Sequence, residues 1–321
     1  MKVFTFLGVR FENLCILLQF PLPLMAAENI MQKLAKTINE QIALLEERGL
    51  IIPDKDKARE VLMDIGYYRL GFFAFPFEQT YPSLKNRSHR LREGVYFEDL
   101  LALYYFDSDL RDIVTHFLNR IEVNLRTYMT YTASIKYKDN PVWFVDSRYV
   151  LNSYIETFPS KVYKTIKESP TIKRHHKNYI NDKYAPAWKT LEFMTLGNIL
   201  SLYDSLKDNG LQKDIAAHYG CNIKTFKNYF NTIKFLRNRC AHGACIYNMN
   251  LPQGITSSGP AGKMEGEDRH NINGTIRVVE YILGKVSINR LKEMKGRLQD
   301  FLSLPYSDNV KDAIKKCSNL L

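Results

Sequence analysis

The stretch LRDIVTHFLNRIEVNLR, residues 110–126, decides the fold class of this chain. Its apolar residues recur at spacings of three and four, which places them on one face of an α-helix. These residues are Leu110, Ile113, Val114, Phe117, Leu118, Ile121 and Leu125. The helical pattern extends from about Tyr96 to Lys136. We therefore predict one long amphipathic helix over this range.

The same spacing of apolar residues predicts helices on both sides of this segment. They cover residues 26–49, 53–66, 185–207, 211–220, 222–241 and 276–304. The phenylalanine-rich run 72–77 around Pro76 predicts instead a buried strand-like or irregular piece. The sequence contains no internal repeat and no Gly-rich phosphate loop. We therefore predict an all-α fold, a multi-helix bundle.

Composition divides the chain into four parts. Residues 1–24 are apolar but interrupted by Arg10 and Glu12, so no piece is long enough to span a bilayer. We interpret this stretch as a mis-annotated start or a disordered leader; a short anchor or signal is the alternative. Residues 25–250 are expected to form the helical domain and residues 251–275, rich in Gly and Pro, a flexible loop. Residues 276–321 are expected to provide a C-terminal helix that packs on the bundle.

The net charge of +11 at pH 7 favours a polyanionic partner, although it also promotes solubility. Nucleic acid and an acidic membrane surface both fit this charge. No stretch reaches ~18 apolar residues, so we expect no membrane-spanning segment. The five cysteines show no repeated spacing, which predicts no disulfide framework and a cytoplasmic location.

A basic segment, residues 161–184, carries seven Lys or Arg against two acidic residues, with tyrosines between them. Cations suit phosphates and aromatic rings suit bases, so this segment is a candidate RNA-binding surface. A solvated basic loop is the alternative. The candidate RNA-binding residues here are Lys161, Lys164, Lys167, Lys173, Arg174 and Lys177.

The stretch KFLRNRCAHGACIYN, residues 234–248, contains the candidate site. On a helix over Thr225–Ala241, Arg237 falls in the middle of the apolar face. A guanidinium there is costly unless it is paired with an anion, since it cannot lose its proton. Its partner is therefore expected to be a buried carboxylate, Glu122 or Glu192, or a bound phosphate.

His242 lies five residues further on, roughly 140° away around the helix. Gly243 suits the left-handed position after a last turn, so His242 is expected at the helix end. A histidine in such a place is partly exposed and can act as acid or base near neutral pH. Arg237 and His242 of one chain need not meet, but they could meet across a dimer in which two such helix ends pack together.

Three interpretations of this stretch remain open. Arg237 could be a core ion-pair residue and His242 a helix cap. Zinc could bind through Cys240, His242 and Cys245 with Cys221 as fourth ligand, although the spacing is irregular. The third is ribonuclease chemistry, in which a histidine moves protons and an arginine stabilises charge on the phosphate. The RNA then supplies its own 2′-hydroxyl nucleophile, and neither metal nor cofactor is needed.

Arg237, the polar Asn238, three further residues and His242 resemble the R-x(4–6)-H signature of HEPN-domain ribonucleases. Longer stretches occur in the order seen in the Abi-like (abortive infection) family of bacterial defence proteins. The stretches are LEERGLIIPDKDKAREVLMDIGYYRLGFFAFPF, YYFDSDLRDIVTHFLNRIEVNLRTYMTYTAS, PAWKTLEFMTLGNILSLY and LRNRCAHGACIYN. The resemblance covers roughly residues 37–250.

The resemblance implies a HEPN-like helical bundle, a homodimer that brings two such motifs together, and cleavage of RNA in phage-infected cells. Arg237 and His242 would then be catalytic, and Asn238 would position the site. We expect Glu122 or Glu192 to orient Arg237. Some relatives are associated with a small non-coding RNA, so a regulatory RNA partner is also implied.

This chain departs from typical members of that family at three positions. Gly243 stands where they have a second His, no Trp stands near Tyr247, and Arg239 replaces an apolar residue. The core motif is intact, and Arg239 adds a candidate RNA-binding cation. We therefore predict a metal-independent endoribonuclease of an abortive-infection system. The alternatives are a non-catalytic protein that holds a structured non-coding RNA and a toxin with a non-RNA target.

Overall fold

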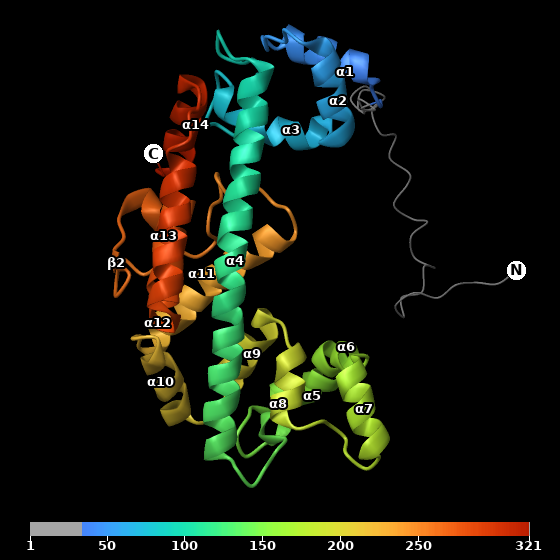
Figure 1. Ribbon diagram of the computed structural model, residues 1–321, viewed down its shortest axis with the longest axis vertical. Helices are drawn as coiled ribbons and strands as arrows, with labels where there is room; N and C mark the ends of the chain where they lie inside the picture. The colour runs from blue at the N-terminus through green and yellow to red at the C-terminus, as the bar shows by residue number, and fades with distance from the viewer. Residues whose placement is uncertain (1–33, 321) are drawn as a thin grey trace, which may run out of the picture.

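Helix α4 (Phe97–Lys136) is the longest element of the computed structural model, which describes residues 34–320 (Figure 1). Its 40 residues span about 60 Å at 1.5 Å per residue. The apolar stripe predicted on it is confirmed, since its members are at most 1% exposed except for the half-buried Ile113. Helices α3 and α8 to α14 all pack against α4. The prediction of an all-α fold is confirmed.

Three short helices lie beside the N-terminal end of α4 (Figure 1). They are α1 (Ile38–Glu47), α2 (Lys55–Asp64) and α3 (Tyr67–Ala74), and α3 continues into a 3₁₀ turn, Phe75–Phe77. Thr37 and Glu40 form a capping box, in which each side chain accepts a hydrogen bond from the other's backbone amide. The Asp54 carboxylate caps α2, which confirms the predicted start of the second helix.

Two predictions for this region need correction. The helix expected over residues 26–49 begins at Ile38, because residues 34–37 are not helical; residues 26–33 lie outside the described part of the chain, as do residues 1–24. The phenylalanine run is helical rather than strand-like. Helical winding places Phe73 and Phe77, four residues apart, in the core and leaves Phe72 50% exposed.

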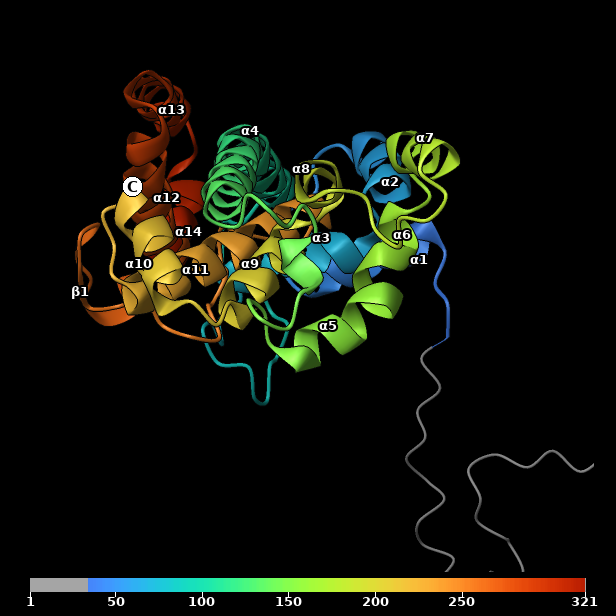
Figure 2. The same cartoon turned by 90° about the horizontal axis from the view of Figure 1, so that it is seen from below.

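A lobe of short elements lies beside the C-terminal end of α4 (Figures 1 and 2). It comprises a 3₁₀ turn (Trp143–Val145), α5 (Asn152–Phe158), a π-helical turn (Pro159–Tyr163), α6 (Lys164–Ile166), α7 (Pro170–Asn178), α8 (Ala187–Thr190) and a further 3₁₀ turn (Leu191–Phe193). The aromatic side chains of Trp143, Phe144 and Phe158 are completely buried. The basic segment is therefore largely helical, and the interpretation of it as a loop is wrong.

Helices α9 (Leu196–Ser205), α10 (Asn209–His218) and α11 (Ile223–Ala241) follow. The helix expected over residues 185–207 is divided, because the Thr195 hydroxyl caps α9 by accepting from Asn198 N. The predicted end of the next helix is confirmed by Gly220, which has a φ of 64°. Helix α11 matches its predicted range and crosses α4 (Figure 1).

The C-terminal part differs most from prediction. It contains the hairpin β1 (Ser258–Gly259) and β2 (Gly262–Lys263), a 3₁₀ turn (Gly266–Arg269), α12 (Ile272–Val286), α13 (Ile288–Leu302) and α14 (Asp308–Ser318). The segment 251–275, expected to be a flexible loop, buries Ile255 and Met264 completely. The helix expected over 276–304 is two helices, since Ser287 has extended backbone angles and its hydroxyl caps α13.

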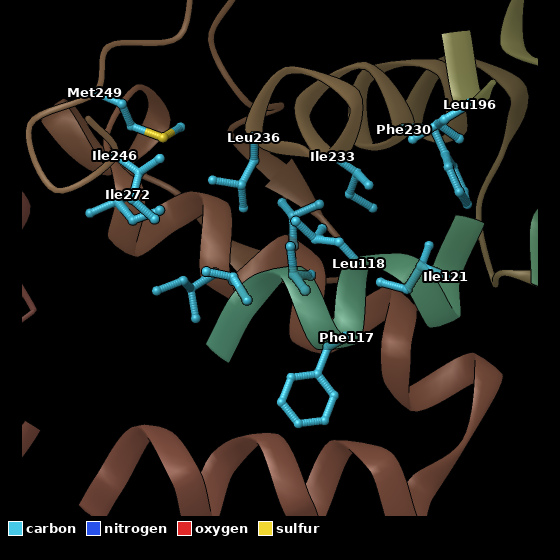
Figure 3. Packing of buried hydrophobic residues seen from close by; sticks show 14 of the residues in the cluster. Phe117, Leu118, Ile121, Leu196, Phe230, Ile233, Leu236, Ile246, Met249 and Ile272 are labelled. Atoms are coloured by element: carbon cyan, nitrogen blue, oxygen red, sulfur yellow. The ribbon is translucent and has the colours of Figure 1, made fainter. Parts of the chain in front are cut away.

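The core is centred on the crossing of α4 and α11. Leu118 and Ile121 from α4 pack near Phe230 and Ile233 from α11, whereas Phe117 points to the opposite side of α4, where Arg297 of α13 lies over its ring (Figure 3). The five apolar residues are at most 1% exposed. The cluster continues past the end of α11 to the buried Ile246 and Met249. This packing fixes the orientation of α11 about its own axis, and hence which of its residues face solvent.

We expect Leu118→Ala to lower the free energy of unfolding by about 2–5 kcal/mol, because it opens a cavity in this core. Val123→Ala, at a position of α4 that is 43% exposed, should change it by less than about 0.5 kcal/mol. Urea titration followed by circular dichroism measures both. Equal losses in the two variants would contradict the assignment of the stripe as the centre of the core.

Candidate active site

The C-terminal end of α11 carries the candidate catalytic histidine. His242 is the C-cap residue, and Gly243 follows with a φ of 62°. Gly243 N donates to Cys240 O (3.2 Å) and Ala244 N donates to Arg239 O (2.9 Å), which together form a Schellman motif. The predicted helix end is confirmed, and the His242 side chain is exposed.

Two arginines from other helices surround this helix end. Arg69 Nη1 of α3 donates to the carbonyl oxygen of Gly243 at 2.9 Å. A β-carbon built on Gly243 would lie 3.4 Å from Arg111 Nη1 of α4, and its φ is one that L-residues rarely adopt. Glycine therefore suits this position better than the second histidine of typical relatives.

Asp107 of α4 fixes the chain that leaves α11, and sequence reasoning missed it. Its Oδ1 accepts hydrogen bonds from the backbone amides of Ile246 (2.7 Å) and Tyr247 (2.8 Å). Arg111 Nε lies 3.2 Å from its Oδ2. Burial raises the pKa of Asp107, while the two amides and the Arg111 charge lower it in part. The sequence does contain a signal for it, because Asp107 lies three positions before Leu110 and thus on the apolar stripe of the helix, where an acidic residue needs a partner.

Arg237 points toward α4 and is held there. Its Nε lies 3.1 Å from Glu122 Oε2, and the side chains are 32% and 8% exposed respectively. Glu122 Oε1 also accepts from Arg126 Nη2 at 2.9 Å. The expected carboxylate partner is therefore confirmed as Glu122. Glu192 is the wrong candidate, because it is 58% exposed and lies 3.6 Å from Arg126 Nη1 instead.

His242 faces a different space, which we call the α11 groove. This groove has a volume of ≈ 530 Å³ and runs between α11 and residues 251–253. Its lining includes Lys234, Phe235, Asn238, Arg239, His242 and Gln253. Arg237 is not part of that lining. Within one chain the structure thus brings His242 together with Asn238 and Arg239, and it ties Arg237 to Glu122 on another side of α11.

The Abi-like protein family matches residues 60–248, from α2 to the segment that Asp107 holds. The match covers more than half of the chain. The chain belongs to the Abi-like protein family. Membership suggests a role in abortive infection. Comparison with curated proteins and with solved structures finds no match.

The zinc site considered for this Abi-like protein would use Cys221, Cys240, Cys245 and His242. Burial raises the pKa of the Cys240 thiol and of the Cys221 thiol to about 11, and it also raises the pKa of Cys245. Within residues 34–320, no three His, Cys, Asp or Glu side chains are grouped as a metal site would require.

The basic segment of the Abi-like protein presents all six predicted RNA-binding cations to solvent. One of them, Lys173, pairs with Glu168 at 2.9 Å. One of the tyrosines expected to stack on bases is instead part of the core: Tyr163 is buried, and its hydroxyl lies 2.6 Å from His176 Nε2. Tyr179 remains 57% exposed and stacks on His175. The segment thus offers many cations but few rings for stacking.

Helices that could cross a bilayer were sought over residues 34–320 of the Abi-like protein. None there combines the length and the apolar character that a membrane span requires.

Asp107→Ala should lower the free energy of unfolding by about 2–6 kcal/mol, because two buried amides lose their acceptor at about 1–3 kcal/mol each. Asp107→Asn should lose less, since its amide oxygen can still accept. Chemical denaturation measures both, with the exposed Asp109→Ala as control. A control loss as large as that of Asp107→Ala would show that these hydrogen bonds do not anchor the segment.

Proposed function

We propose that this Abi-like protein is a metal-independent endoribonuclease that acts in the cytoplasm during abortive infection. The observation that carries the proposal is the α11 groove, in which the exposed His242 shares one surface with Lys234 and Arg239. Within residues 34–320 none of these three side chains forms an ion pair with an acidic residue. Their charge is therefore available to an RNA phosphate.

The proposed reaction is an internal phosphoryl transfer. The imidazole of His242 accepts the proton of a 2′-hydroxyl, whose oxygen attacks the adjacent phosphorus. The P–O5′ bond breaks, and the 5′-oxygen leaves with a proton from the imidazolium of a histidine or from water. A 2′,3′-cyclic phosphate remains on the first fragment. Guanidinium groups stabilise the charge on the phosphate oxygens, as fixed donors do in other sites.

The placement of Arg237 supports a site shared by two chains. Arg237 and His242 diverge by roughly 140° around α11, and Glu122 holds the arginine away from the groove. Arg237 remains 32% exposed, so one edge of its guanidinium is open to an anion from outside the chain. We propose a homodimer in which Arg237 of one protomer and His242 of its partner flank the same phosphate, with Asn238 positioning it.

A second candidate function is RNA binding without cleavage. The exposed cations of the basic segment favour it, since all six lie on the lobe of short elements beside the C-terminal end of α4. In that case the protein would hold a structured non-coding RNA, and His242 would be a helix cap. A toxin with a non-RNA target would instead arrest growth while cellular RNA stays whole.

His242→Ala should reduce cleavage of total bacterial RNA by about 10²- to 10⁴-fold, the usual contribution of a general acid–base group. Wild-type activity should persist in EDTA, and the products should end in 2′,3′-cyclic phosphates. Electrophoresis and end-group analysis measure these, with His116→Ala, a half-exposed histidine on α4, as control. Full activity of His242→Ala, complete loss in EDTA, or 3′-hydroxyl ends would each contradict the proposed chemistry.

Mixing Arg237→Ala with His242→Ala should restore activity that neither variant has alone. In a random mixture half the dimers are mixed, and each keeps one intact site, so about a quarter of wild-type activity is expected. The assay is RNA cleavage after co-refolding or co-expression of the two chains. An inactive mixture that still contains mixed dimers would place both residues in a site within one chain.

A further inference from the structure

The face of α11 that lines the groove continues well beyond His242. Phe235 lies seven residues before His242, which is close to two full turns, so both side chains share one face about 10 Å apart. Asn238 and Arg239 lie between them, and Asn231 lies one turn further on. The groove thus offers a row of an aromatic ring, polar groups and a histidine along a single helix.

Phe235 is placed to receive a flat ligand. Its ring is half-buried in the groove wall, and the Arg239 guanidinium carbon lies 5.7 Å from the ring centroid. Arg239 itself is steadied by donating from Nε to the Cys245 carbonyl oxygen at 2.8 Å. An aromatic ring beside a fixed cation matches a nucleobase beside its phosphate.

The opposite wall of the groove is rigidly attached to α11. Asn228 Nδ2 donates to Gly254 O at 3.0 Å, and Asn228 Oδ1 accepts from Thr256 N at 2.9 Å. These bonds hold residues 251–256 along the helix. Two other amides of the lining, those of Asn231 and Gln253, make no side-chain hydrogen bond within residues 34–320.

The lining contains three basic residues and no acidic one. Its ≈ 530 Å³ lies within the range of roughly 300–1,000 Å³ that is usual for sites that hold small organic groups. A base inside a duplex cannot reach a ring on a helix, whereas an unpaired base can turn outward and stack. Charge, volume and ring together favour an unpaired nucleotide over a second protein helix.

We propose that the α11 groove binds one unpaired RNA nucleotide next to the scissile phosphate. Its base stacks on Phe235, its phosphate lies against Arg239, and the free amides of Asn231 and Gln253 meet the edge of the base. This inference rests on the proposed ribonuclease function and adds the substrate class to it: single-stranded RNA, with base preference set at this subsite.

The test is RNA binding in a His242→Ala background, where cleavage is expected to be about 10²- to 10⁴-fold slower. A fluorescein-labelled single-stranded RNA of ten nucleotides and a blunt duplex of equal charge are titrated by fluorescence anisotropy. Phe235→Ala should weaken binding of the single strand by about 5- to 150-fold, the range for one lost stacking interaction. Phe235→Tyr should retain affinity. Binding of the duplex should change little.

Controls keep the result interpretable. Phe193→Ala removes a phenylalanine that is 40% exposed and lies outside the groove, and it should leave binding unchanged. Phe235→Leu keeps an apolar side chain in the wall, so it replaces Phe235→Ala if that variant does not melt like the parent. Equal affinity of the Phe235 variants and the parent would overturn the subsite, as would equal losses for single strand and duplex.

The outcome separates this inference from the proposed function. If the wild-type protein cuts RNA while the Phe235 variants bind normally, the ribonuclease proposal stands and the subsite proposal is wrong. If the wild-type protein does not cut RNA but Phe235→Ala weakens binding of the single strand, the subsite proposal stands and the catalytic proposal is wrong.

Discussion

The hydrogen bonds that Asp107 accepts from the backbone of Ile246 and Tyr247 are the constraint on which the rest of the site depends. A carboxylate that is 1% exposed is costly to bury, and the cost is offset only if its oxygens are matched by donors. The two amides provide donors for Oδ1, and the Arg111 charge lies 3.2 Å from Oδ2, which accepts no hydrogen bond within residues 34–320. Since Asp107 belongs to α4, these hydrogen bonds fix the position of the segment after α11 relative to α4. The turn at Gly243 and the adjacent His242 are thereby also positioned relative to α4.

Glu122, further along α4 toward its C-terminal end, is a second buried carboxylate that connects α4 to α11. Its carboxylate pairs with Arg126 of its own helix and with Arg237 of α11, so one buried anion is shared by two cations. Helix α11 and the segment after it are therefore held to α4 by two charged residues, Glu122 and Asp107, and Phe230 and Ile233 pack on the N-terminal side of Arg237. This arrangement divides α11 into a side that is committed to α4 and a side that is open to the groove. On the open side, Lys234, Arg239 and His242 form no ion pair within residues 34–320.

The sequence predicted the parts of this protein that are governed by local periodicity. The range of α4, its apolar stripe and the end of α11 at Gly243 all follow from residue spacing and from the properties of glycine. The cost of an unpaired guanidinium predicted an anionic partner for Arg237, but it left Glu122, Glu192 and a bound phosphate as alternatives, and only the structure identifies Glu122. The failures have a common cause. Ser287 breaks a continuous helical pattern through its backbone angles, residues 251–275 gain structure by burying Ile255 and Met264, and Asp107 acts on residues 139 and 140 positions away. Each of these features depends on contacts between residues that are far apart in the chain, and local sequence patterns do not reveal such contacts.

The division of α11 into two sides also bears on the meaning of its R-x4-H spacing. A spacing of five residues turns a helix by roughly 140°, so it can never place two side chains on one ligand along a single straight helix. If convergence within one chain were the requirement, spacings of three, four or seven would serve it better. A spacing that sends the arginine to the inner side and the histidine to the outer side is instead suited to a surface where a second helix end supplies the missing partner. The buried pair with Glu122 therefore does more than stabilise the core: it fixes the direction from which Arg237 can be approached, and it leaves Arg239 as the cation of the same chain that we propose for phosphate binding.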